Sequence, residues 1–312
     1  MSKQLAASGA KHFADHLISE IRDVGHPLCV GLDPHLDLIP SLFTQGSMHP
    51  SDELTAQAIE SFLSAVLERI AGRVAIVKPQ IAFFEQLGWR GLRVLSRLCA
   101  RAQADGLTVL LDAKRGDIGS TAKAYAKAYL TADATMPVNA LTLNPYLGLD
   151  SLAEFAAVAA GAGKGLFVLV KTSNPGSGDL QDQQVQAQPL YIQVARGLVA
   201  MHGALKGPVT GWSSLGVVCG ATWPHQAALV REALPHALFL VPGYGAQGGS
   251  AADALAGFVP GPYGLEGGIV NTSRGVVFAA NSAAASSTAA WEQAIDNALE
   301  SSIDELGNAV HV

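Results

Sequence analysis

Short runs of apolar and β-branched residues alternate along this chain with longer segments that have helical spacing. The short runs predict eight strands: Leu28 to Leu32, Val74 to Lys78, Thr108 to Asp112, Val138 to Leu143, Leu166 to Lys171, Leu215 to Cys219, Leu238 to Pro242 and Gly268 to Asn271. The longer segments predict helices between them, with only a short one after the seventh strand: Ser51 to Ile70, Glu85 to Ala104, Gly119 to Thr131, Ser151 to Ala160, Pro189 to Met201 and Trp223 to Leu234. This order is typical of repeated βα units and a parallel sheet.

Eight such units favour an α/β fold of one closed (β/α)8 TIM barrel over an open, doubly wound sheet. No long linker rich in Pro, Gly and Ser separates two parts of different composition, so we expect residues 1–312 to form a single barrel domain. Thr288 to Leu306 predicts a closing helix. The Ala- and Ser-rich stretch from Ala279 to Ser287 predicts a mobile connection before it.

An amphipathic helix is predicted before the first strand, over Gly9 to Asp23. Phe13, Leu17 and Ile21 lie on one stripe of this helix because they are four residues apart. We expect this N-terminal helix to cap the bottom of the barrel.

Composition places the chain among globular proteins, since 49% of its residues are hydrophobic and 15% are charged. The net charge is -6 and the sequence contains no basic stripe, which argues against nucleic acid or an anionic membrane as a partner. We expect a cytoplasmic protein, because the sequence begins without a signal pattern and contains no apolar run of the ~18 residues that span a membrane. Cys29, Cys99 and Cys219 lie in separate apolar stretches and predict reduced core thiols, with neither disulfide nor zinc.

The third predicted strand leads directly into three ionisable residues. Side chains two apart on a strand share a face, so we expect Asp112 and Lys114 to point to the same side, with Asp117 just beyond the strand end. A surface ion pair is the alternative, but the apolar residues 107–111 favour a buried strand. In a (β/α)8 barrel the C-terminal strand ends carry the chemistry, and most polar residues there also suit ordinary turns. Turn formation does not explain the lysines at two other strand ends, Lys78 and Lys171.

A glycine-rich loop follows the seventh predicted strand. Residues 243–248 match the dinucleotide fingerprint G-x-G-x-x-G, and Glu266 follows about 20 residues later. We reject a dinucleotide site, because that fingerprint belongs to the first βα turn of an open sheet. We expect a phosphate site instead, because the ends of the seventh and eighth strands commonly bind phosphate in a barrel. The backbone amides of the loop and the guanidinium of Arg274 would bind the phosphate oxygens. Tight turns and a surface arginine remain the alternatives.

Several of these motifs occur together, in the same order, in one known family. Over nearly its whole length the chain resembles the orotidine 5'-phosphate decarboxylases, in their longer bacterial branch. The resemblance rests on Gly31 to Pro34, Val77 to Gln80, Asp112 to Ile118, Lys171 to Ser177, Pro242 to Gly249 and Asn271 to Gly275. It implies a cofactor-independent carboxy-lyase that converts orotidine 5'-phosphate to UMP and CO2 in de novo pyrimidine biosynthesis. It also implies a homodimer with active sites at the interface.

The resemblance further implies a role for each matching residue. The catalytic charge array comprises Lys78, Asp112, Lys114 and Asp117, the last contributed by the other subunit. Substrate binding involves Asp33 and Lys78 at the ribose, Thr121 of the partner subunit at the ribose, Ser173 at the pyrimidine edge, Asn174, and Gly243, Tyr244, Gly245, Gln247 and Arg274 around the phosphate. The loop from Ser177 to Gln188 departs from the family pattern, because it is long and glutamine-rich. We expect it to close over the ligand.

Loss of CO2 from orotidine 5'-phosphate leaves a carbanion at C6 with no adjacent π-system and no cofactor to accept the charge. The ammonium of Lys114 would stabilise this carbanion and then protonate it. At about 4 Å and an effective dielectric of about 20, one ion pair is worth roughly 4 kcal/mol, so two carboxylates would keep Lys114 charged despite burial.

Two other functions remain open. The pattern of Asp112, Lys114 and Asp117 also occurs in magnesium-dependent sugar-phosphate decarboxylases and aldolases. Those enzymes use a carboxylate at the end of the second strand to help bind magnesium, whereas this chain has Lys78 there and Glu85 only further along the following helix. A non-catalytic nucleotide-binding barrel would need no charge array. We predict no metal site, and we expect His35, His202, His225 and His236 at the surface.

Overall fold

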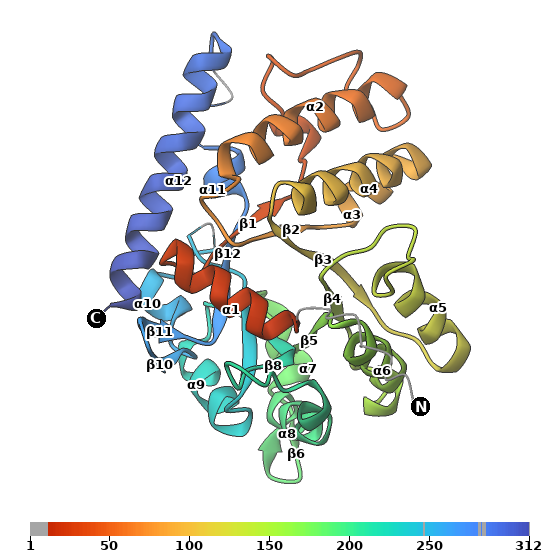
Figure 1. Cartoon of the computed structure of the whole chain (residues 1–312), viewed down its shortest axis with the longest axis vertical. Helices are drawn as coiled ribbons and strands as arrows, with labels where there is room; N and C mark the ends of the chain where they lie inside the picture. Colours follow the sequence, from red (N-terminus) through yellow and green to blue (C-terminus); the bar gives the residue numbers. More distant parts are fainter. Residues whose placement is uncertain (1–11, 246, 280–281, 283–284, 312) are drawn as a thin grey trace, which may run out of the picture.

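Eight parallel strands close into a barrel in the computed structural model of this chain, which describes residues 12–245, 247–279, 282 and 285–311 (Figure 1). Each strand pairs with the next one along the chain, and the last pairs with the first. The strands are β1 (Leu28–Leu32), β2 (Ile76–Pro79), β3 (Thr108–Arg115), β4 (Ala140–Leu143), β5 (Gly165–Lys171), β8 (Ser213–Cys219), β9 (Ala237–Val241) and β12 (Gly268–Thr272). The predicted (β/α)8 fold class is confirmed, and so are all eight predicted strands, with small shifts at their ends.

Helices surround the barrel, as the periodicity predicts (Figure 1). The longer ones are α2 (Glu53–Ile70), α4 (Gly88–Ala104), α5 (Gly119–Tyr129), α6 (Ala153–Ala162), α8 (Leu190–His202), α9 (Pro224–Ala233) and α12 (Thr288–Val310). Short helices are α3 (Ala82–Glu85), α7 (Gly178–Gln181), α10 (Ala251–Ala254), α11 (Arg274–Val277), η1 (Leu36–Leu38), η2 (Leu149–Leu152), η3 (Pro175–Ser177) and η4 (Gly203–Leu205). The short helix α10 is the one predicted after the seventh strand.

Strand alternation divides the apolar residues into two clusters. On β1, Leu28, Val30 and Leu32 belong to the cluster between barrel and helices, whereas Cys29 belongs to the cluster that fills the lumen. This division follows from the two-residue period of a strand. Cys29, Cys99 and Cys219 are all buried and free, as predicted.

Helix α1 (Phe13–Val24) covers the N-terminal end of the barrel (Figure 1). The side chains of Phe13, Leu17 and Ile21 are buried in the same cluster as the lumen residues of the strands. The Phe13 ring meets the ring of Phe167 edge to face at 6.1 Å. The predicted capping helix is therefore confirmed from residue 13 onward, while residues 9–11 of the prediction lie outside the described part of the chain.

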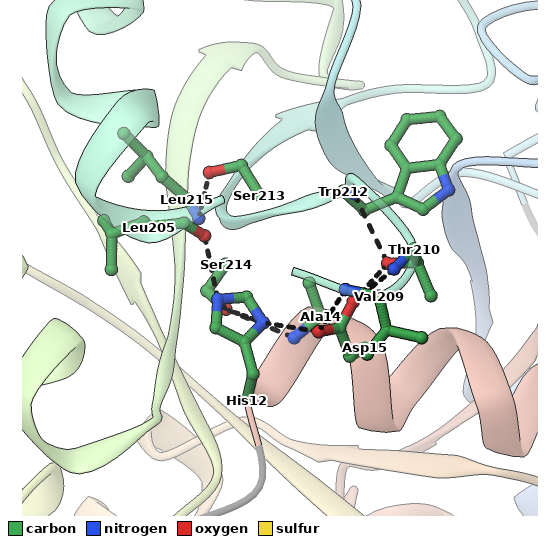
Figure 2. A network of polar contacts seen from close by, with 10 residues as sticks. All are labelled: His12, Ala14, Asp15, Leu205, Val209, Thr210, Trp212, Ser213, Ser214 and Leu215. Atoms are coloured by element: carbon green, nitrogen blue, oxygen red, sulfur yellow. Dashed lines mark hydrogen bonds and ion pairs between the residues drawn. The ribbon is translucent and has the colours of Figure 1, made fainter. Parts of the chain in front are cut away.

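Polar contacts tie the start of α1 to the loop before β8 (Figure 2). His12 Nε2 lies 3.1 Å from the carbonyl oxygen of Leu205, and Asp15 accepts hydrogen bonds from the amide and hydroxyl of Thr210 at 2.7 and 2.6 Å. Burial raises the pKa of Asp15, but these bonds outweigh it and leave the pKa below its usual value. The bottom of the barrel is thus closed, and a ligand must approach the C-terminal strand ends.

Glu266, which lies in the hairpin of β10 (Val259–Gly261) and β11 (Gly264–Glu266), belongs to this bottom end. Its carboxylate accepts from Arg22 of α1 at 3.0 Å and from the indole nitrogen of Trp212 at 3.0 Å. Glu266 therefore holds α1 in place, which agrees with our rejection of a dinucleotide-binding loop.

The closing helix is confirmed as α12, which packs beside α2 (Figure 1). Asp296 of α12 pairs with Arg69 of α2 and with Arg73, whose nitrogen lies 2.9 Å away. The predicted mobile connection falls partly on residues 280–281 and 283–284, which are outside the described part of the chain. Among the helices that the structure describes, none has both the length and the apolar character that crossing a bilayer requires.

Two expectations about local structure are wrong. The segment from Ser177 to Gln188 is not a loop, because it contains α7 and leads into a hairpin of β6 (Gln184–Val185) and β7 (Gln188–Pro189). His202 is not a surface residue. Its buried Nε2 has no hydrogen-bond partner among the described residues, and burial, with His236 and Arg231 nearby, lowers its pKa to about 4.

Candidate active site

Two adjoining cavities open at the C-terminal ends of the strands. The first, which we call the glycine-loop cavity, has a volume of about 360 Å³ and is lined by Asp33, Gly243, Tyr244, Gln247 and Arg274. The second, the charged cavity, has a volume of about 220 Å³ and is lined by Lys78, Asp112, Lys114, Ser173 and Asn174. Pro242 and Asn271 line both cavities, so an elongated ligand can extend from one into the other.

Asp112 lies between two lysines in the charged cavity. Its Oδ1 is 2.6 Å from Lys114 Nζ and its Oδ2 is 3.2 Å from Lys78 Nζ. Burial alone would raise the pKa of Asp112, but the two ammonium groups lower it to about 2. Burial would likewise lower the pKa of Lys78, but Asp112 and Asp33 outweigh it and raise that pKa. Asp112 and Lys78 therefore face the cavity as ions at neutral pH.

The contact between Asp112 and Lys114 was predicted, but regular strand alternation does not produce it. The pairing of β3 with β4 shifts between Leu111 and Arg115, and Lys114 has a φ of 47°. A left-handed backbone is costly for any residue with a Cβ, and such strain concentrates at functional sites. The irregular end of β3 thus brings the Lys114 ammonium to the carboxylate.

Thr142 of β4 holds this irregular backbone, and sequence reasoning missed it. Its hydroxyl oxygen accepts from the amides of Ala113 and Lys114 at 2.9 and 2.8 Å, and its hydroxyl donates to Asp112 Oδ1 at 3.0 Å. Thr142 is fully buried. Nothing in the sequence distinguishes this threonine from others on predicted strands, because its role depends on where β3 bends.

We predict that Thr142→Val lowers the free energy of unfolding by about 2 to 4 kcal/mol and kcat by about 10-fold or more. The valine keeps the shape but leaves two amides and one carboxylate oxygen without their buried partner. Denaturant titration and steady-state assays measure the two effects. Thr108→Val on the neighbouring strand β3 is the matched control, since the buried Thr108 hydroxyl has no partner in the described residues. Equal effects of the two substitutions would contradict the prediction.

Three predicted site residues lie outside both cavities. Asp117 Oδ1 accepts from the amide of Ile118 at 2.8 Å, and Thr121 is exposed on α5. Gly245 is the third of these residues. It helps to shape the glycine-rich loop, since its amide donates to the carbonyl of Gly249 at 2.9 Å.

Lys114 lines the charged cavity, but it is more exposed than we expected from the sequence. In the single chain 45% of its side chain is exposed.

The glycine-rich loop begins with a left-handed turn. Gly243 has a φ of 95°, which residues with a Cβ rarely adopt. The Tyr244 hydroxyl donates to Glu305 of α12 at 2.7 Å, and burial together with this carboxylate raises the pKa of Tyr244. The Tyr244 side chain therefore anchors the loop to α12, and Tyr244 lines the cavity together with Arg274 of α11.

Asn271, Asp33 and His35 complete the walls of the glycine-loop cavity. Asn271 also lines the charged cavity, and its Oδ1 lies 3.8 Å from the Cys29 sulfur. Asp33 Oδ1 is buried without a hydrogen-bond partner among the described residues, which suits a carboxylate that binds ligand hydroxyls. From the sequence we assigned Asn271 no separate role and expected His35 at the surface, whereas the structure shows a half-buried His35 side chain that lines this cavity. The His35 ring packs against Phe83 at 4.4 Å between centroids.

Metal ligands are not gathered at this site. Within the described ranges, no group of three or more His, Cys, Asp or Glu residues is placed to hold a metal ion. Glu85, the first acidic residue after β2, pairs with Arg115 at 2.8 Å.

Comparison with known proteins identifies the family. The sequence profile of the orotidine 5'-phosphate decarboxylase/HUMPS family matches residues 26–289. This chain belongs to that family. The orotidine 5'-phosphate decarboxylase of Rhodopirellula baltica is 43% identical over 271 residues, which cover 86% of this chain and 88% of the relative. That of Deinococcus radiodurans is 42% identical over 252 residues, covering 81% and 84%.

Solved structures of the orotidine 5'-phosphate decarboxylase family agree with this assignment. A crystal structure from Streptomyces avermitilis that carries the same enzyme name superposes with a TM-score of 0.78 at 34% identity, covering 98% of this chain and 99% of that one. A Leishmania donovani orotidine monophosphate decarboxylase superposes with a TM-score of 0.72 at 34% identity, covering 96% and 99%. The fold and the sequence therefore lead to the same family.

Proposed function

We propose that this protein is an orotidine 5'-phosphate decarboxylase, which forms UMP and CO2 in de novo pyrimidine biosynthesis without a cofactor. The observation that carries the proposal is the row of Lys78, Asp112 and Lys114 in a cavity that adjoins the glycine-rich loop and Arg274. The two cavities suit the two ends of a nucleotide. The relatives that share this name cover most of the chain, which supports the same activity here.

In the proposed complex the phosphate lies in the glycine-loop cavity. Gln247, Arg274 and the backbone of residues 243–245 would bind it, since a guanidinium and backbone amides suit phosphate oxygens. The unpartnered Asp33 carboxylate and Lys78 would bind ribose hydroxyls near Asn271, where the two cavities meet. The pyrimidine would then lie in the charged cavity, with Ser173 and Asn174 at its edge.

Decarboxylation breaks the bond from C6 of the pyrimidine to the carboxylate carbon. The bonding electron pair stays on C6, CO2 leaves, and Lys114 donates a proton to C6 to give UMP. The Lys114 ammonium would stabilise the negative charge as it develops, because Asp112 holds that ammonium at 2.6 Å. Asp112 would also lie near the substrate carboxylate, and departure of CO2 would relieve their repulsion.

A homodimer would supply what the single chain lacks around Lys114. The Lys114 side chain is 45% exposed, and Asp117 and Thr121 lie outside the cavities of their own chain. Large apolar side chains are exposed at the same end of the barrel, with Ile118 at 60% and Tyr146 at 75%. An interface over these residues would bury Lys114 and bring Asp117 and Thr121 of the partner subunit to the site.

We predict that mixing two inactive variants, Lys114→Ala and Asp117→Ala, restores about one quarter of the wild-type activity. In a mixed dimer one site carries both substitutions and the other carries neither, and mixed dimers are about half of a random population. Unfolding and refolding the mixture, followed by an activity assay, tests this. The same treatment of each variant alone is the control. Absence of any recovery in a mixture that forms dimers would place Asp117 outside the partner's site.

The proposed function is tested by incubating the protein with orotidine 5'-phosphate and a chelator while the pyrimidine absorbance is followed. Loss of the substrate signal supports the decarboxylase. Activity on a sugar phosphate that needs added Mg²⁺ would instead indicate the metal-dependent relatives, and binding of UMP with no turnover would indicate a non-catalytic barrel.

We also propose that residues 1–312 form one domain, because strands from both ends of the chain, β1 and β12, close the barrel together.

A further inference from the structure

Lys171 is a fully buried lysine that the proposed mechanism does not use. It ends β5, two residues after Leu169, which lines the charged cavity. Regular alternation would point both side chains into the lumen. Leu169 pairs with Val218 and Lys171 with Cys219, so two steps along β5 correspond to one along β8. This bulge turns Lys171 out of the lumen, toward the helices.

Outside the lumen, Lys171 binds the residue that follows α7. Its Nζ donates to Asp182 Oδ1 at 2.7 Å, and it lies 4.6 Å from the ring centre of Trp223 and 5.8 Å from that of Tyr191. The Asp182 side chain is 42% exposed, whereas that of Lys171 is 0% exposed. A buried ammonium is costly unless it is paired, so this contact fixes α7 against the end of β5.

Helix α7 in turn holds Thr172, the first residue of the segment 172–174 that lines the charged cavity. Gln181 Oε1 accepts from the Thr172 amide at 2.9 Å, and Gln181 Nε2 donates to the Thr172 hydroxyl at 2.8 Å. The indole nitrogen of Trp223 donates to the Thr172 carbonyl at 2.9 Å. Trp223, which contacts Lys171, and α7, which is fixed by the Lys171–Asp182 pair, therefore both hold Thr172.

The remaining residues of this segment depend on the same surroundings. The Thr172 hydroxyl donates to Asn174 Oδ1 at 2.7 Å, and the Thr222 hydroxyl donates to the Ser173 carbonyl at 3.1 Å. A Cβ added to Gly220 would lie 2.7 Å from Ser173 Cα, so Ser173 packs directly on the backbone at the end of β8. A small displacement of Thr172 would move both Ser173 and Asn174.

We propose that Lys171 and Asp182 are positioning residues: their ion pair docks α7 and thereby sets the segment 172–174 against the base of the bound nucleotide. This inference rests on the proposed function for the identity of the ligand. The glycine-loop cavity is lined by residues at the C-terminal ends of β1, β9 and β12 or just after them, and segment 172–174 is not among them. Ser173 does pack against Gly243 of the glycine-rich loop, but the other residues that line this cavity do not depend on α7. Loss of the pair is therefore expected to weaken recognition of the base much more than recognition of the phosphate.

The variant Lys171→Met, which removes the charge and keeps the length, tests this with two ligands. We expect calorimetry to find binding of UMP weakened about 10-fold or more, and binding of ribose 5-phosphate changed less than about 2-fold. Hydrogen exchange is expected to be faster at the Thr172 amide and in α7, and unchanged at the start of β5. Lys164→Met, at the residue just before the same strand begins, is the control and should change neither measurement.

Asp182→Asn provides a second variant should Lys171→Met fail to fold, and it should show the same separation between the two ligands. Equal weakening of both ligands, or unchanged exchange at Thr172 and α7 in a folded variant, would overturn the proposal. The exchange measurement needs no ligand. If the wild-type protein binds no UMP, the proposed function fails, while the exchange data still decide whether the pair docks α7.

Discussion

Replacing Lys114 by alanine is expected to lower kcat for orotidine 5'-phosphate by about 10³-fold or more while UMP still binds. The ammonium is the group that would both stabilise the C6 carbanion and supply the proton, and each contribution alone is commonly worth about 10²-fold or more. Lys78, the other lysine that lines the charged cavity, is not expected to take its place, because it is itself paired with the second oxygen of Asp112 at 3.2 Å. Steady-state kinetics and UMP calorimetry measure the two quantities.

A lysine elsewhere on the surface is the matched control for Lys114. Lys206 is exposed and lies beside the start of β8, at the closed end of the barrel, so Lys206→Ala should leave kcat unchanged. Turnover of Lys114→Ala within tenfold of the wild type would remove Lys114 from its proposed role. Loss of UMP binding together with turnover would indicate a disturbed site instead of a missing proton donor.

The second large effect is expected at Arg274. We predict that Arg274→Ala lowers kcat/KM for orotidine 5'-phosphate by about 10²-fold. A charge-assisted hydrogen bond to phosphate is worth about 1.5 to 3 kcal/mol, and a guanidinium can form two such bonds to one phosphate. Arg274 is exposed at the glycine-loop cavity and does not line the charged cavity where the chemistry would occur. Its binding energy would serve to close and dehydrate the site around the reacting base.

Orotidine, which lacks the phosphate, distinguishes this explanation from general damage to the site. Wild-type kcat/KM should be lower for orotidine than for its phosphate by orders of magnitude. Arg274→Ala should leave kcat/KM for orotidine nearly unchanged, since the group that Arg274 binds is absent and the two losses are not additive. Comparable wild-type efficiency for the two substrates would refute the coupling between phosphate binding and turnover.

Much of this protein can be predicted from its sequence, because the deciding interactions are local. Burial on both faces of a parallel strand requires a continuous apolar run, and β1 appears where Leu28 to Leu32 predicts it. The eight barrel strands pair in chain order, because successive βα units of a closed barrel lie side by side. The polar residues after each run then gather at one end of the barrel, so Lys78, Asp112 and Lys114 share a cavity as predicted.

Only the tertiary structure decided how those residues point. Lys114 reaches Asp112 through a left-handed backbone and a shifted register on β3, and Lys171 leaves the lumen through a bulge on β5. A bulge depends on the fit of a strand to both of its neighbours, so the sequence of that strand alone does not reveal it. The same reason hides Thr142, whose hydroxyl has its role only because β4 lies beside the bent end of β3.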